Sequence, residues 1–205
     1  TFQLIHGQAK HIYQTSLLGS HQVENALVSL KTVDIISESG HPISQDAKYQ
    51  GLSEVHWPGR FQVIGTNPLV ITDGAHNVDS AKRLKETVAE YLNGQDVTLI
   101  FGCGIDKDAA NMVKELSLVN PKRIIATNSR HPKAFSALAI HELFEPHSRH
   151  CIEKDSVKSA LTYAIESGKN TDVILVTGSL FIASEAIEWA TGKAPELYDI
   201  EPSIL

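Results

Sequence analysis

From residue 61 onward, short continuous apolar runs alternate with stretches whose apolar residues recur at helical spacing. The continuous runs predict strands at 61–64, 69–72, 97–101, 123–126 and 173–177, with a weaker strand at 150–152. The spaced stretches predict helices at 81–92, 109–116, 138–144, 157–165 and 180–187. Strands that alternate with amphipathic helices indicate an α/β domain with a mostly parallel sheet.

The first part of the chain follows another pattern. A strand is predicted at 13–18 and a helix at 20–30, and the Ser, Gly and His-Pro of residues 34–41 predict a loop. Ser44 is predicted to cap a short helix that ends near Gly51.

A domain boundary is predicted at the Trp-Pro-Gly segment. Pro58 and Gly59 stop regular structure there, and the pattern changes after them. We therefore expect two domains, at 1–56 and 57–205.

Composition excludes some classes of protein. The net charge of −6 argues against a non-specific nucleic-acid binder, which would need a basic face. The two cysteines form no ligand motif and suit a reducing cytosol, so we expect a cytoplasmic protein. No apolar run reaches the length of a membrane span, and no signal peptide is visible.

Small and polar residues follow four of the predicted strands, at 73–77, 102–108, 127–130 and 178–179. Turns are polar in any protein, so a single one of these segments carries little information. The carboxyl ends of parallel strands meet at one edge of a sheet, which is where such folds bind ligands. The four segments together predict a shared site at that edge.

Each segment admits a functional and a structural interpretation. Asp73 could accept the hydroxyls of a ribose, and His76 could bind a phosphate or carboxylate or carry a proton, but Asp73 or Asn77 could equally cap the next helix. Ser179 could present a helix N-terminus to a carboxylate, or serve only as an ordinary cap.

Three further motifs carry less weight. The Gly-x-Gly at 102–104 lacks the third glycine of a dinucleotide-binding loop, and residues 106–108 are interpreted as a helix cap. The histidines at 141, 147 and 150, with Cys151, match no common zinc spacing and are interpreted as surface residues. The sequence contains no phosphate-binding G-x-x-x-x-G-K-[ST] motif.

Five motifs, in order and over nearly the whole chain, resemble those of folylpolyglutamate synthases and dihydrofolate synthases of the Mur ligase superfamily. They are the segments HQVENA at 21–26, WPGR at 57–60, DGAHN at 73–77, DKD at 106–108 and TGSLF at 177–181. The chain departs from the family at Val78, where proline is usual, at Phe181, where tyrosine is usual, and at 130–134, which only loosely resembles the family's PRA turn.

The resemblance implies a Rossmann-like Mur ligase C-terminal (glutamate ligase) domain at 57–205. Residues 1–56 would be the remnant of the central ATPase domain. Since the chain begins at Thr1 and lacks the P-loop, we expect it to be the C-terminal portion of the enzyme, inactive alone without its N-terminal ATPase domain.

The resemblance also implies site residues. Asn25 would contact the adenine of ATP, Arg60 its phosphates and Asp73 its ribose. His76 and Ser179 would place the incoming L-glutamate, with His76 and Arg60 near the reacting phosphate.

The implied reaction is ATP-dependent and ADP-forming. A folate or dihydropteroate carboxylate becomes an acyl phosphate, and the glutamate amine then forms the amide. Mg²⁺ would bridge the phosphates, with its ligands mostly outside this chain, so no residue here is assigned to metal. We expect a monomer with no nucleic-acid or membrane partner. Two alternatives stay open: a Mur-type peptidoglycan amino-acid ligase, and a free-standing nucleotide- or amino-acid-binding module.

Overall fold

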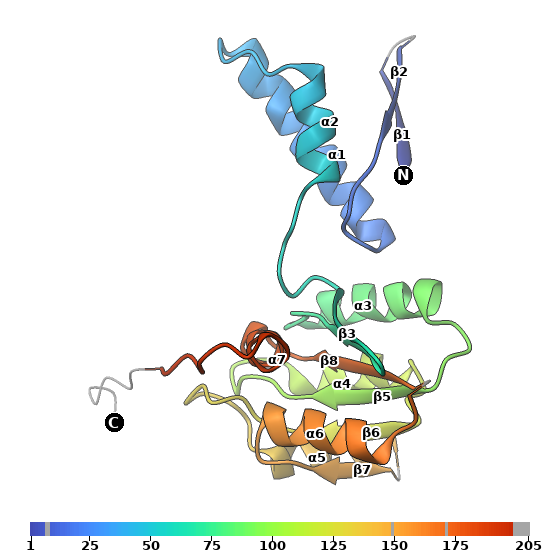
Figure 1. The fold of residues 1–205 in the computed structure, drawn as a ribbon, viewed down its shortest axis with the longest axis vertical. Coiled ribbons are helices and arrows are strands. Elements are labelled where there is room, and N and C mark those ends of the chain that lie inside the picture. Colours follow the sequence, from blue (N-terminus) through green and yellow to red (C-terminus); the bar gives the residue numbers. More distant parts are fainter. Residues whose placement is uncertain (7–8, 149, 171, 199–205) are drawn as a thin grey trace. The chain divides into compact units, whose positions relative to one another are not determined.

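A computed structural model of the protein describes residues 1–6, 9–148, 150–170 and 172–198. The chain divides into two compact units, Thr1–Trp57 and Pro58–Leu205 (Figure 1). Residues 199–205, the last of the expected second domain, lie outside the described range.

The first unit pairs a hairpin with two helices. Its elements are β1 (Phe2–His6), β2 (Ala9–Tyr13), α1 (Ser20–Glu38) and α2 (Gln45–Ser53), and β1 and β2 are antiparallel. Tyr13 is buried and its ring lies 4.8 Å from that of Tyr49 on α2, so the hairpin packs on this helix.

Two expectations for this unit are wrong and one is confirmed. The strand predicted at 13–18 ends at Tyr13. The loop predicted at 34–41 begins late because α1 continues to Glu38, and no Gly or Pro interrupts it before Gly40. Ser44 caps α2, as predicted, by accepting a hydrogen bond from Ala47 N.

The second unit contains strands and helices in alternation. In chain order they are β3 (Gln62–Thr66), β4 (Leu69–Thr72), α3 (Val78–Tyr91), β5 (Val97–Phe101), α4 (Ala109–Ser117), β6 (Arg123–Ala126), α5 (Ala137–Phe144), β7 (Cys151–Glu153), α6 (Val157–Ser167), β8 (Val173–Thr177) and α7 (Leu180–Thr191). The six-stranded sheet has the order β3-β4-β8-β5-β6-β7. Only β3 pairs antiparallel, so the predicted α/β class with a mostly parallel sheet is confirmed.

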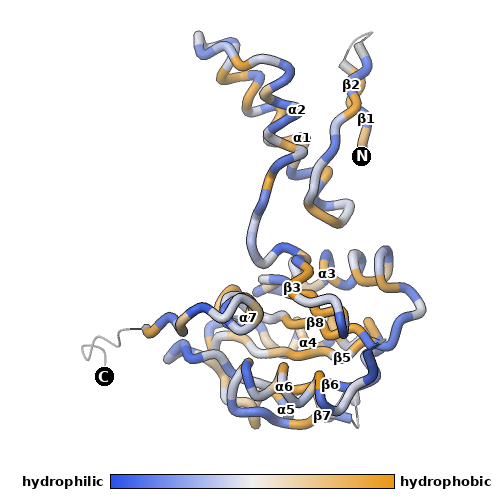
Figure 2. The backbone as a smooth tube through the Cα atoms, in the orientation of Figure 1, coloured by the Kyte–Doolittle hydropathy of each residue, from blue (hydrophilic) through white to orange (hydrophobic). Residues whose placement is uncertain are grey.

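Helices cover both faces of this sheet. On one face, α6 and α7 pack against alternate strand residues such as Ile100, Ile125 and Val176. Phe101, the next residue along β5, points to the opposite face, where its ring meets that of Phe144 on α5 at 5.6 Å. The central strands are therefore apolar on both sides, as their hydropathy colouring in Figure 2 shows.

Candidate active site at the carboxyl ends of the strands

The segments predicted to form a shared site follow the carboxyl ends of adjacent strands. In three of the four segments, the first residue continues the ladder by one further hydrogen bond to the neighbouring strand, and two of these bonds end on the last residues of β8. These bonds join Asp73 N to Val176 O (2.9 Å), Gly102 N to Thr177 O (3.3 Å) and Thr127 N to Phe101 O (2.9 Å). The turns after β4, β8, β5 and β6 therefore start side by side at one edge.

Two glycines let these turns approach one another closely. A Cβ atom on Gly102 would lie 2.4 Å from Thr127 O, and one on Gly178 would lie 2.4 Å from Gly102 O. Any side chain would push the turns apart, so only glycine permits this spacing.

The turn that follows β4 is bonded to the residues on both sides of Arg60. Gly74 N donates to Gly59 O at 2.7 Å, and Phe61 N donates to Asp73 Oδ2 at 2.9 Å. The residues before and after Arg60 are thus both bonded to the turn that follows β4. Arg60 is partly exposed, and within the described residues its guanidinium has no hydrogen-bond or ion-pair partner.

The start of α7 lies against the same turn. A Cβ atom on Gly74 would come within 2.5 Å of Leu180 Cδ2, and one on Gly59 would lie 3.5 Å from Ala183 Cβ. The structure therefore brings the segments of Arg60, Asp73, His76 and Ser179 to one region at the carboxyl edge.

The Asp73 carboxylate binds backbone amides with both oxygens. Oδ2 accepts from Phe61 N, and Oδ1 accepts from Ala75 N at 2.8 Å. A carboxylate offers about four lone-pair directions. More than two donors can therefore approach one carboxylate at the same time.

The helix α3 is capped by Asn77 and not by Asp73. Asn77 Oδ1 accepts from Ser80 N, and the Ser80 hydroxyl in turn accepts from the backbone N of Asn77, which forms a capping box. The cap leaves His76 partly exposed with Nδ1 2.9 Å from Gly74 O. A carbonyl only accepts, so Nδ1 carries the proton and Nε2 of the neutral ring is the acceptor.

Ser179 caps α7 and is 5% exposed. Its hydroxyl oxygen accepts from Ile182 N at 3.1 Å, which leaves the hydroxyl proton to donate. The structure therefore shows Ser179 as an ordinary helix cap. A role in substrate binding would be additional to this structural role.

Asn25 belongs to the first unit, whereas the other four candidates belong to the second. It is exposed on α1, and its Nδ2 donates to Gln22 Oε1 at 3.1 Å. The amide therefore has hydrogen-bonding capacity left for a ligand.

The turn after β5 is built as a helix cap. Asp108 Oδ1 accepts from Asn111 N, as interpreted from the sequence, and Lys107 pairs with Asp106 at 2.7 Å. Cys103 in this turn is 3% exposed, and burial raises the pKa of its thiol to about 12. It is not a nucleophile near neutral pH.

A cluster beside the turn after β6 was not predicted. Arg130 pairs with Glu188 on α7 at 2.6 Å and lies 3.5 Å from the buried carboxylate of Glu185, and its Nε donates to Glu196 O at 3.2 Å. Burial raises the pKa of Glu185. These partners lie more than fifty positions from Arg130 in the chain, so no local sequence signal could have joined them.

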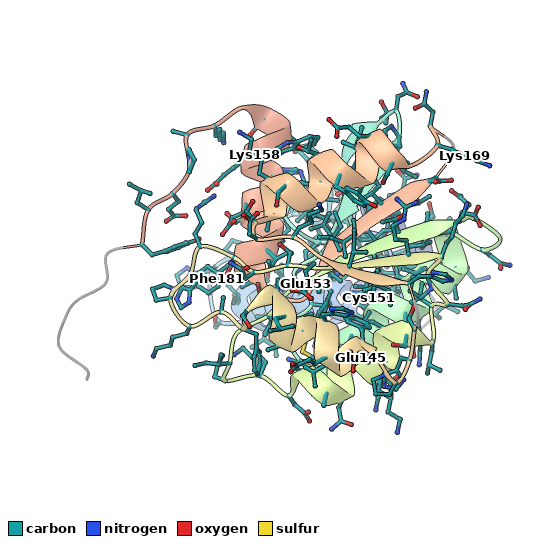
Figure 3. All side chains as sticks on the ribbon, turned by 90° about the horizontal axis from the view of Figure 1, so that it is seen from below. Glu145, Cys151, Glu153, Lys158, Lys169 and Phe181 are labelled. Atoms are coloured by element: carbon teal, nitrogen blue, oxygen red, sulfur yellow. The ribbon has the colours of Figure 1, made fainter. Side chains whose placement is uncertain are left out.

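An aromatic group adjoins this cluster. The rings of His131 and Phe181 stack at 4.1 Å, and Tyr198 packs edge-on against both. In Figure 3, Phe181 lies at the end of the sheet opposite Lys169, because Phe181 follows β8 and Lys169 precedes it. The segment after α7 is thereby held against the carboxyl edge.

The described residues offer no metal centre and no membrane span. Within the part of the chain that the structure describes, no group of three or more His, Cys, Asp or Glu side chains could hold a metal ion. His141 instead pairs with Glu153 at 2.6 Å. No described helix is both long and apolar enough to cross a bilayer.

Comparison with known proteins agrees with the motifs. Residues 59–180 match the family described as Mur ligase, glutamate ligase domain. A probable bifunctional folylpolyglutamate synthase/dihydropteroate synthase of Halobacterium salinarum is 36% identical over 83% of this chain and 20% of its own length. The dihydrofolate synthase/folylpolyglutamate synthase of Bacillus subtilis is 31% identical over 84% of this chain and 40% of its own length.

Solved structures agree as well. A bifunctional folylpolyglutamate synthase/dihydrofolate synthase with Mn, AMPPNP and L-glutamate bound superposes with a TM-score of 0.74 and 26% identity, over 88% of this chain and 42% of that one. This chain thus spans well under half the length of the relatives it matches. The resemblance to the C-terminal portion of these synthases is confirmed, and the chain belongs to the Mur ligase family, whose glutamate ligase domain it carries at residues 59–180.

Proposed function

We propose that this chain is the glutamate ligase portion of an ATP-dependent, ADP-forming amide ligase that adds L-glutamate to a folate or to dihydropteroate. The observation that carries the proposal is the convergence of the Arg60, Asp73, His76 and Ser179 segments at one sheet edge. The names of the relatives, and the nucleotide and glutamate bound in a related structure, support this choice of substrates.

Arg60 and Asp73 are proposed to bind the nucleotide. The Arg60 guanidinium has no partner among the described residues, so it can stabilise the charge of a transferring phosphoryl group. The partly exposed carboxylate of Asp73 is proposed to accept the ribose hydroxyls. Asn25 is proposed to reach the adenine with its exposed amide.

His76 and Ser179 are proposed to place the glutamate. The N-terminus of α7 favours a carboxylate, and the Ser179 hydroxyl keeps a proton to donate. The Nε2 atom of neutral His76 can accept a proton from the incoming ammonium. The proposed chemistry has two steps: an acyl phosphate forms on the acceptor carboxylate, and the glutamate amine displaces the phosphate. We assign no described residue to Mg²⁺.

The test is glutamate-dependent release of ADP by the protein that contains this chain. MgATP, L-glutamate and either reduced folate or dihydropteroate are supplied, and the pteridine product is identified by mass spectrometry. Arg60→Ala should lower kcat/KM for ATP by about 100-fold. The control Lys82→Ala changes an exposed cation on α3 and should leave kcat/KM unaltered.

Two results would overturn the proposal. One is a protein that extends no pteridine acceptor and instead adds an amino acid to a muropeptide, which would establish the peptidoglycan alternative. The other is tight binding of ATP or glutamate by the isolated chain in calorimetry, which would favour a free-standing binding module. We expect weak binding and no turnover from the isolated chain.

A further inference from the structure

The turn that carries Arg60 has an unusual backbone. Phe61 has φ of 42°, in the left-handed region, although it is not glycine. For a residue with a Cβ this conformation is disfavoured, because the Cβ comes close to the backbone carbonyl oxygen. Phe61 is 5% exposed, and its ring lies 6.2 Å from that of Tyr91. Burial of the ring and a bond to its amide must therefore hold the conformation.

The bond to the Phe61 amide comes from Asp73. Its Oδ2 accepts Phe61 N at 2.9 Å, and charge-assisted bonds of this kind are stronger than neutral ones. Its Oδ1 accepts Ala75 N at 2.8 Å, which fixes the carboxylate itself. One side chain thus joins the turn before β3 to the turn after β4.

From these contacts we infer that Asp73 is a positioning residue for Arg60. Its carboxylate holds Phe61 in the left-handed conformation, and this sets the direction in which the Arg60 side chain leaves the backbone. The inference rests on the proposed function for the role of Arg60 with phosphate. It is additional to the ribose binding proposed above.

The Asp73→Asn variant tests the inference with little change in volume. An amide has one oxygen, so one of the two backbone N–H groups must face an NH₂ donor. A displacement of Arg60 by about 1 Å should lower kcat/KM for ATP by about 100-fold. If Asp73 acts through Arg60, the same substitution in an Arg60→Ala background should cost about tenfold less than in the parent protein, and the loss that remains there is attributed to the ribose contacts.

Equal losses in both backgrounds would overturn the inference, because Asp73 would then act on the nucleotide independently of Arg60. The use of 2′,3′-dideoxy-ATP, which lacks both ribose hydroxyls, gives a second test. Positioning predicts that Asp73→Asn still impairs its use, whereas a role confined to the ribose predicts no further loss. If Asp73→Asn fails to fold, Asp73→Glu keeps the charge, displaces it by one methylene and is tested in the same two backgrounds.

Amide NMR spectra of the chain itself separate this inference from the proposed function. They need no nucleotide and no turnover. Asp73→Asn should shift the Phe61 and Arg60 amide resonances strongly, while the amides of β7, at the other edge of the sheet, stay in place. Unchanged Phe61 and Arg60 resonances would refute the positioning role even in an active ligase. Shifted resonances in a protein without ligase activity would support it while the proposed function failed.

Discussion

Replacing Gly178 with alanine should be among the most damaging single-methyl changes in the second unit. The new Cβ would lie 2.4 Å from Gly102 O and 2.8 and 2.9 Å from two ring carbons of Phe101. Contacts of this length do not occur for real Cβ atoms, so the turns after β5 and β8 would have to separate. Gly178 also has φ of 114°, which side chains disfavour.

The expected loss has two parts. A positive φ costs a residue with a Cβ about 1–2 kcal/mol. Overpacking a rigid site costs about 1–3 kcal/mol more. We expect the total loss of stability to lie in the upper part of the two ranges combined. The atoms that the new Cβ would meet are a backbone carbonyl and the Phe101 ring, which is itself packed edge-on against Phe144.

The assay is urea unfolding followed by fluorescence of Trp189, which packs against the core of the second unit. The other tryptophan, Trp57, is exposed and is replaced by phenylalanine in every variant. The control is Gly192→Ala, which has φ of 64° but no atom within 4 Å of the new Cβ. It should lose only about 1 kcal/mol. Losses for the two variants that agree within about 0.5 kcal/mol would refute the close approach of the two turns.

Three further outcomes follow from the contacts. Ser179→Ala should lose about 1 kcal/mol of stability, because α7 loses its cap, and should raise KM for glutamate. The control Ser136→Ala removes the exposed cap of α5 and should lose similar stability without a change in KM. Equal effects of the two variants on KM would contradict the substrate role of Ser179. Burial raises the pKa of Cys103 from 9.0 to about 12. The unfolded chain therefore ionises first, and stability should fall above pH 9, by about 2 kcal/mol at pH 10.5. In Cys103→Ser, the free energy of unfolding should differ less between pH 8 and pH 10.5 than in the parent protein. An equal pH dependence in the two proteins would contradict a buried, un-ionised thiol at position 103. Arg130→Ala should lower the free energy of unfolding by about 2–3 kcal/mol, because it leaves the Glu185 carboxylate buried without its cation. The double variant Arg130→Ala/Glu185→Gln should recover most of this loss in the same unfolding assay. A double variant as unstable as Arg130→Ala would contradict the ion-pair explanation.

The four inner strands of the second unit were predictable because they are largely buried on both faces. The runs 69–72, 97–101, 123–126 and 173–177 are mainly apolar, and their predicted bounds agree with the structure. The elements of the first unit were harder to predict, because its hairpin has no such run. The helix α1 is only weakly amphipathic and continues past its predicted end.

The site was predictable to the level of segments and not of atoms. Motif order placed Asp73 and Ser179 at one edge, since parallel strands end together. The hydrogen bond that the Phe61 amide donates to Asp73 depends on a turn twelve residues away, whose left-handed residue no propensity would suggest. The partners of Arg130 depend in the same way on tertiary packing.

The tie between Arg130 and the segment after α7 has a practical consequence for protein production. Glu196 contributes both its N–H, to Glu188, and its carbonyl, to Arg130, and Tyr198 closes over Phe181. A purification tag fused close behind Tyr198, or a cloning boundary set at Gly192, would loosen or remove these contacts. Expression vectors that leave the carboxyl end untagged would keep this side of the protein intact.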